Sequence, residues 1–197
     1  MANTKTQERP SLSIVRKLDA APGKVWRAIT EPEMLKKWMA PADDFKIPTA
    51  ETDLRVGGRY HIVMHAPDGE VHDVSGAYRE VVANKKLVYT WAWKSTPERE
   101  SIVTIELRAA GSGTELTLKH EQFADSEARD RHQHGWMGCL ARLEKAVAAQ
   151  APSEQGEGVH APARRALPRA PGAALGQGRK ELRLRYRKEY SRDIVSA

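Results

Sequence analysis

The stretch from Asp125 to Gln150 most constrains the fold, because its pattern predicts one long amphipathic helix. Asp125 is a favourable N-cap residue, since its carboxylate can accept a hydrogen bond from a backbone N–H of the first turn. Pro152 lies just beyond the other end and cannot continue a helix. Large apolar residues recur on one helical face, at Trp136, Leu140, Leu143 and Val147. Such a helix would be roughly 38 Å long and therefore needs an extended partner surface.

Two glycines, Gly135 and Gly138, interrupt this helix on either side of Trp136. A glycine inside a helix costs about 1 kcal/mol relative to alanine, so a structural reason is expected for each. The pair indicates either close approach of another backbone segment or space left beside the indole of Trp136. The helix itself is either a core-packing element or a lid over a cavity, and both interpretations stay open at this point.

The residues before this helix alternate between helical and strand patterns. Residues 11–18 form an expected strand, and residues 22–30 and 32–38 form two short helices that each begin at a proline. Six further strands are expected at 44–52, 58–65, 71–82, 86–94, 101–107 and 114–121. Strands grouped together, with helices kept apart from them, are typical of an α+β fold with an antiparallel sheet.

The dipeptide Asp68-Gly69 predicts a two-residue hairpin turn. With that turn His65 faces His72, and cross-strand neighbours lie about 5 Å apart, close enough to share a metal ion. His61 would lie about 13 Å from His65 along the strand and cannot join them. Two imidazoles without a third ligand make a poor zinc site. A solvent-facing pair is therefore expected, and no metal ion is predicted.

Charge is unevenly distributed along the 197 residues, whose net charge is +6. Residues 151–197 hold 10 Lys/Arg against 5 Asp/Glu, whereas residues 1–150 hold 22 against 21. The nearly neutral first part is not expected to bind nucleic acid, and any weak binding of that kind is assigned to the basic tail, 151–197. Residues 1–10 are expected to form a flexible arm, and the Ala/Pro/Gly/Arg-rich tail to be disordered. The domain is therefore expected to span residues 11–150.

The chain contains one cysteine, Cys139, which excludes an internal disulfide bond and is expected to be a buried, inert thiol. No apolar run reaches the about 18 residues that a transmembrane helix needs. The first residues also lack the apolar segment of a signal peptide. A cytoplasmic protein without a membrane span is the expectation.

Four segments within residues 11–150 resemble one known family. They are VRKLDAAPGKVWRAITEPEMLKKWMAP, DLRVGGRYHIVMHAPDGEVHDVSGAYREVVANKKLVYTW, GTELTLKHEQF and HGWMGCLARLE. Together they resemble the activator of heat-shock protein 90 ATPase homologue-like group of the SRPBCC, or START-like, superfamily. The resemblance implies a helix-grip fold, in which a curved seven-stranded antiparallel sheet wraps a long C-terminal helix around an apolar cavity. Many bacterial relatives are single small domains, and the superfamily includes polyketide cyclases, lipid carriers and a co-chaperone domain.

His120 is the main candidate for chemistry, because it shares a strand face with Leu116 and Leu118 and is expected to point inward. Three roles are open to it: a hydrogen bond to a ligand, general-base catalysis, or a structural bond to a backbone carbonyl. His132 and His134 are expected to be exposed. No carboxylate pair has a geometry suited to acid–base catalysis, and no nucleophile elbow or phosphate-binding loop is present.

Four tryptophans from three of the expected elements are expected to converge on one interior space, as an aromatic pocket for an apolar ligand. The expected ligand-binding residues are Trp38, Tyr60, Ile62, Met64, Trp91, Trp93, His120, Trp136 and Leu140. The first hypothesis is a START-like domain that binds a small hydrophobic or amphipathic molecule between the sheet and the long helix. One alternative is a co-chaperone-like module that binds a chaperone and stimulates its ATPase. Another is a cyclase- or hydrolase-type enzyme that uses His120. No cofactor is expected.

Overall fold

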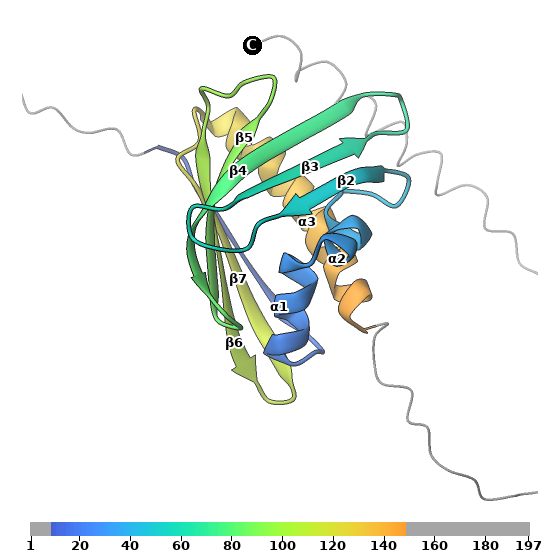
Figure 1. Ribbon diagram of the computed structural model, residues 1–197, viewed down its shortest axis with the longest axis vertical. Helices are drawn as coiled ribbons and strands as arrows, with labels where there is room; N and C mark the ends of the chain where they lie inside the picture. Colours follow the sequence, from blue (N-terminus) through green and yellow to red (C-terminus); the bar gives the residue numbers. More distant parts are fainter. Residues whose placement is uncertain (1–8, 149–197) are drawn as a thin grey trace, which may run out of the picture. The chain divides into compact units, whose positions relative to one another are not determined.

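The computed structural model describes residues 9–148 and has the predicted α+β architecture (Figure 1). The elements in chain order are β1 (Leu12–Leu18), α1 (Pro22–Thr30), α2 (Pro32–Trp38), β2 (Lys46–Thr52), β3 (Arg59–His65), β4 (Val71–Val82), β5 (Lys86–Trp93), β6 (Ser101–Ala110), β7 (Gly113–Glu121) and α3 (Ser126–Ala148). The expectations for residues 1–8 and for the basic tail lie outside the described residues, as do the last two positions of the predicted long helix.

All seven strands form one antiparallel sheet in the order β1-β7-β6-β5-β4-β3-β2. Strands β2 to β7 follow one another as a meander, and β1 pairs with β7 at the far edge because α1 and α2 carry the chain across. Figure 1 shows the sheet curving around α3. Helix α2 packs against β2 and α3, and α1 contacts α3, β6 and β7.

Sheet curvature has a local cause in strands β4 and β5. The pairing register of β4 and β5 shifts between Tyr78 and Glu80, and irregularities of this kind generally bend a strand. Gly76 lies where a Cβ atom would be only 1.9 Å from the carbonyl oxygen of Thr90. The hydroxyl of Tyr60 donates to that same oxygen over 2.8 Å. The missing side chain at Gly76 therefore permits the close approach that the bent sheet requires.

Helix α3 has the predicted N-cap and buried face. A carboxylate oxygen of Asp125 accepts a hydrogen bond from the backbone N–H of Ala128 over 2.7 Å. The four residues of the predicted stripe are at most 3% exposed: Trp136, Leu140, Leu143 and Val147. The spacing of apolar residues in the sequence thus correctly predicted which face of α3 is buried.

The two glycines of α3 have different surroundings. A Cβ atom at Gly138 would lie 2.1 Å from the carbonyl oxygen of Pro41, in the loop between α2 and β2, so the helix backbone approaches that loop closely. A Cβ atom at Gly135 would have no heavy atom within 4 Å outside its own helix and chain neighbours. The expected close backbone approach is therefore found at Gly138.

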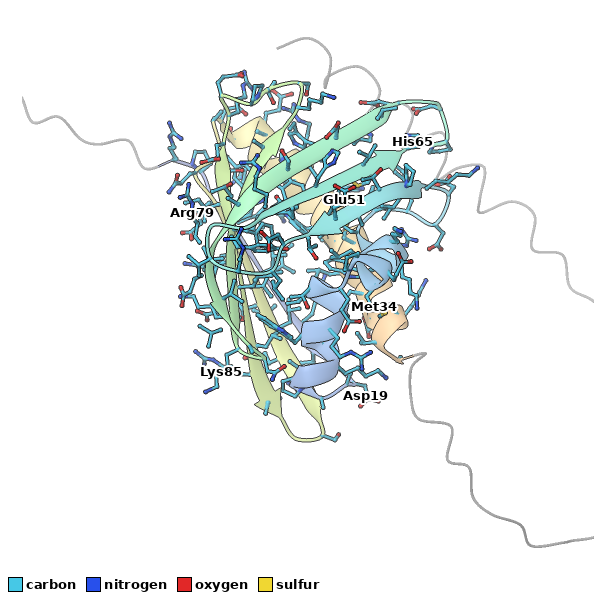
Figure 2. All side chains as sticks on the ribbon, viewed as in Figure 1. Asp19, Met34, Glu51, His65, Arg79 and Lys85 are labelled. Atoms are coloured by element: carbon cyan, nitrogen blue, oxygen red, sulfur yellow. The ribbon has the colours of Figure 1, made fainter. Side chains whose placement is uncertain are left out.

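The predicted register of the β3–β4 hairpin is wrong by one residue. His65 pairs with Val71, and Met64 pairs with His72. The reason is a three-residue loop rather than a two-residue one: the N–H of Ala66 bonds to the carbonyl of Glu70, and Gly69 takes a φ of 95°. His65 is consequently exposed at the end of β3 (Figure 2), whereas the His72 ring stacks on Phe45 at a centroid distance of 6.0 Å.

Candidate functional site

An aromatic cluster lies where the end of β5, the end of β7 and the first half of α3 meet. Its members are Trp91, Trp93, His120, Phe123, His132 and Trp136. The indole of Trp91 contacts those of Trp93 and Trp136 at centroid distances of 5.3 and 5.2 Å. The two imidazoles lie 5.0 Å apart in an edge-on arrangement. The structure thus brings together three of the four predicted pocket tryptophans with His120.

His120 is completely buried and uses both ring nitrogens inside the protein. Its Nδ1 accepts a hydrogen bond from the indole N–H of Trp136 over 3.0 Å. Because an indole can only donate, the imidazole proton must reside on Nε2, which donates to the hydroxyl of Ser101 over 2.8 Å. Ser101 in turn donates to the carbonyl of Trp91 over 3.1 Å. General-base chemistry by His120 would require breaking the bond to Trp136.

His132 likewise makes one hydrogen bond with each ring nitrogen. The prediction that it would be exposed is wrong. Its Nε2 accepts a hydrogen bond from the indole N–H of Trp93 over 3.1 Å, and its Nδ1 donates to the carbonyl of Ala128 over 2.7 Å. A sequence signal existed, since His132 lies four residues before Trp136 and so shares its helical face. His134 is exposed, as expected.

Both cluster histidines are held in the neutral form. Burial lowers the pKa of His120 well below its ordinary value, and the neighbouring His132 lowers it further. Burial also lowers the pKa of His132, where the bond to the Ala128 carbonyl opposes the shift and Arg131 adds to it. At neutral pH each imidazole therefore acts as an acceptor for one indole and carries no charge.

Trp91 holds the one indole N–H of this cluster that has no acceptor. The side chain is 5% exposed, and its Nε1 finds no hydrogen-bond partner among the described residues. Burying an unpaired donor of this kind costs about 1–3 kcal/mol. Native proteins leave few such groups unpaired, and each calls for a missing acceptor or another explanation.

The other predicted ligand-binding residues lie elsewhere in the core. The indole of Trp38 donates to the carbonyl of Ala28 over 2.8 Å and so joins α2 to α1. Tyr60 lies in a group of buried tyrosines with Tyr78 and Tyr89, and burial raises the pKa of each of the three. The remaining three are buried core residues: Ile62, Met64 and Leu140.

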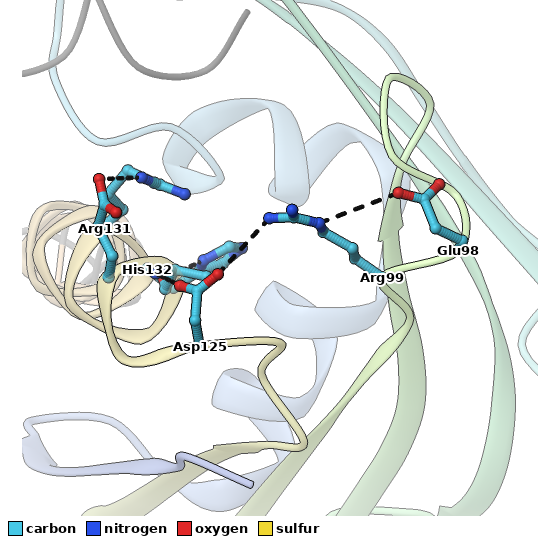
Figure 3. A network of polar contacts seen from close by, with 7 residues as sticks. Glu98, Arg99, Asp125, Arg131 and His132 are labelled. Atoms are coloured by element: carbon cyan, nitrogen blue, oxygen red, sulfur yellow. Dashed lines mark hydrogen bonds and ion pairs between the residues drawn. The ribbon is translucent and has the colours of Figure 1, made fainter. Parts of the chain in front are cut away.

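Charged side chains at the start of α3 lie beside the aromatic cluster (Figure 3). Arg99, from the β5–β6 loop, approaches the carboxylate of Asp125 to 3.7 Å and that of Glu98 to 3.9 Å. Arg131 pairs with Glu127 over 2.8 Å. The cations nearest His132 in this network are thus already paired with carboxylates.

A polar groove of about 650 Å³ lies on the outer face of strands β2 to β5 and shares only Trp93 with the aromatic cluster. It is lined by Glu51 (Figure 2), Arg59, Tyr60, His61, Asp73, Ser75, Ala92, Trp93, Lys94 and Pro97. Asp73 accepts a hydrogen bond from His61 over 2.8 Å and lies 3.4 Å from the ammonium of Lys94. The groove is therefore chemically unlike the aromatic cluster.

Residues 9–148 contain neither a cluster of metal ligands nor a membrane-spanning helix. In that part of the chain, no three His, Cys, Asp or Glu side chains come together in a way that could hold a metal ion. No helix there combines the length and apolar character that crossing a membrane requires. Cys139 is buried, and burial raises the pKa of its thiol to about 12, so the thiol stays protonated at neutral pH.

The curved seven-stranded antiparallel sheet around a long C-terminal helix, with two short helices after the first strand, defines a START-like domain of the helix-grip class. The chain belongs to the family described as activator of Hsp90 ATPase homolog 1-like protein, whose sequence model matches residues 19–148. The predicted family and fold class are thereby confirmed.

Relatives of known structure share this fold over most of their own length. A protein from Nitrosomonas europaea is 30% identical, with a TM-score of 0.62, covering 71% of this chain and 95% of that protein. A protein from Chromobacterium violaceum is also 30% identical, with a TM-score of 0.64, covering 70% of this chain and 96% of that protein.

The human activator of 90 kDa heat shock protein ATPase homolog 1 is similar in sequence. It is 28% identical over 145 residues, which are 68% of this chain but only 38% of the human protein.

Proposed function

We propose that this domain binds a small apolar or amphipathic molecule at the aromatic cluster, between the sheet and α3. The observation that carries the proposal is the buried indole N–H of Trp91, which has no acceptor among the described residues. A site of stacked rings with one convergent polar group is typical of small-molecule pockets. Since the rings are in contact with one another, binding would require some of them to move apart.

Titration with the neutral fluorophore 6-propionyl-2-dimethylaminonaphthalene would test this proposal. The expected result is a saturable blue shift of its emission, together with quenching of tryptophan emission. Trp136→Ala should weaken the affinity for the fluorophore at least tenfold, because that indole contacts Trp91 at a centroid distance of 5.2 Å. A urea unfolding curve would establish that the variant remains folded.

Lys94→Ala is the matched control, since this exposed residue lines the outer groove and not the aromatic cluster. It should leave the affinity unchanged. Loss of binding in Lys94→Ala with retention in Trp136→Ala would move the site to the outer groove. Absence of a saturable shift in the unaltered protein would count against a pocket for a molecule of this size.

A second candidate function is a co-chaperone-like role, favoured by the similarity to the human activator of 90 kDa heat shock protein ATPase homolog 1. The shared segment is 38% of that protein, so its activity is transferred here only as a proposal. Adding this chain to a chaperone of that class should raise its rate of ATP hydrolysis, with an unrelated protein at equal concentration as the control. An unchanged rate would reject this candidate. Both candidates include a cytoplasmic location, which cell fractionation would test.

A further inference from the structure

We infer that the molecule bound at the aromatic cluster carries an uncharged carbonyl oxygen, as in a ketone, ester or amide, that accepts a hydrogen bond from Trp91. This inference rests on the proposed ligand-binding function and adds the chemical class of the ligand. The hydrogen-bond donors and acceptors of the cluster, and the charges around it, support this chemical class.

Every side-chain acceptor of the cluster is already in use. Nδ1 of His120 accepts from Trp136, and Nε2 of His132 accepts from Trp93. The second nitrogen of each imidazole is a donor, to Ser101 and to the carbonyl of Ala128 respectively. No nitrogen of either ring is left for Trp91, so its acceptor has to come from outside the cluster.

A water molecule suits this position poorly. Buried waters generally make about three hydrogen bonds. Among the side chains of the cluster, Trp91 Nε1 is the single free donor, because the other two indoles donate to the imidazoles and the remaining imidazole nitrogens donate to Ser101 and to the carbonyl of Ala128. A carbonyl oxygen that is covalently attached to an apolar body needs only the one hydrogen bond, and its body would lie against the surrounding rings.

The charges favour an uncharged oxygen over a carboxylate. His120 and His132 are neutral, because burial lowers the pKa of both. At the start of α3, Arg99 already faces Asp125, and Arg131 already pairs with Glu127. A carboxylate would lose its hydration without gaining a cation, which is strongly unfavourable.

Three compounds of closely similar shape separate these possibilities: 2-acetylnaphthalene, 2-ethylnaphthalene and 2-naphthoate. Their dissociation constants would be measured by tryptophan quenching on the full chain and on Trp91→Phe. The quantity of interest is the ratio of the constants for the ethyl and acetyl compounds, because comparing this ratio between the two proteins cancels differences in hydrophobicity. We expect the ratio to fall about tenfold in Trp91→Phe. In the unaltered protein, 2-naphthoate should bind at least about tenfold more weakly than the acetyl compound.

Trp38→Phe is the matched control, because that indole lies outside the cluster and its N–H is bonded to the carbonyl of Ala28; this variant should keep the ratio of the unaltered protein. An unchanged ratio in Trp91→Phe, or preferential binding of 2-naphthoate, would overturn the inference while leaving the proposed ligand-binding function standing. Failure of all three compounds to bind would overturn both.

If Trp91→Phe does not fold, the indole ¹⁵N–¹H signal of Trp91 in the unaltered protein tests the same inference. This signal should move downfield when the acetyl compound is added and should not move when the ethyl compound is added. Equal shifts with the two compounds would refute the inference.

Discussion

Replacing Gly138 by alanine is expected to destabilise the domain, because α3 touches the loop after α2 at this residue. The added Cβ atom would lie 2.1 Å from the carbonyl oxygen of Pro41 and 2.9 Å from its carbonyl carbon. Both atoms belong to the backbone, so the clash can be relieved only by moving the loop or the helix. Overpacking of this kind costs about 1–3 kcal/mol, and the better helix propensity of alanine offsets about 1 kcal/mol. The difference is a net loss of about 0–2 kcal/mol, and because backbone atoms must be displaced we expect a value in the upper half of this range.

Gly135→Ala, in the same helix, is the matched control. No heavy atom outside its own helix and chain neighbours lies within 4 Å of the added Cβ, so only the propensity term applies and stability should rise by about 1 kcal/mol. Urea unfolding followed by circular dichroism gives both values, provided the slope with denaturant stays constant. Equal unfolding midpoints for the two variants, or a Gly138→Ala protein more stable than the unaltered one, would refute the reasoning.

Two further predictions concern acid sensitivity and the anchoring of the same loop. The pKa values of His120 and His132 in the folded protein lie below the value in the unfolded chain. Below about pH 6.5 the unfolded chain therefore binds more protons than the folded protein. The free energy of unfolding should decrease as the pH is lowered, by up to about 1.4 kcal/mol per pH unit for each histidine. Urea unfolding at pH 7.5 and 5.5 checks this. His132→Gln should reduce the dependence of stability on pH, whereas a flat profile for the unaltered protein would contradict the prediction. Arg142→Ala should cost about 2 kcal/mol, because its guanidinium donates to the carbonyls of Ala40 and Ala42 over 3.2 and 3.0 Å. Asp43→Ala removes only an 80% exposed partner and should cost less than about 0.5 kcal/mol in the same assay; equal losses would show that the carbonyl contacts are not what matters.

The fold could be predicted from the sequence because its elements have strong local patterns. The spacing of Trp136, Leu140, Leu143 and Val147 determined which face of α3 is buried, and Asp125 marked its start. Alternation of apolar residues in the strands gave the sheet. Pattern and fold agree wherever burial alone decides the position of a side chain.

The candidate site was only partly predictable, because it depends on partners that are distant in the sequence. Alternation along β7 gave the inward direction of His120 but not its bonds to Ser101 and Trp136, which need the register of β6 and the rotation of α3. His132 was misplaced because its partner Trp93 is 39 residues away. The free N–H of Trp91 could not be predicted, since recognising an unpaired donor requires knowing all of its neighbours.

The two indole–imidazole hydrogen bonds have a consequence for where α3 can sit. Trp93 of β5 donates to His132 of α3, while Trp136 of α3 donates to His120 of β7, so the bonds cross the same interface in opposite directions. If α3 slid along the sheet by one turn, about 5.4 Å, both donors would lose their acceptors, whereas the apolar stripe would still meet apolar side chains. Apolar contacts therefore hold the helix on the sheet, and these two bonds define its axial position relative to the strands, as Gly138 and Arg142 do relative to the loop after α2. A redesigned interface without the two indole–imidazole bonds is expected to keep α3 helical and packed on the sheet, but to allow it more than one axial position relative to the strands.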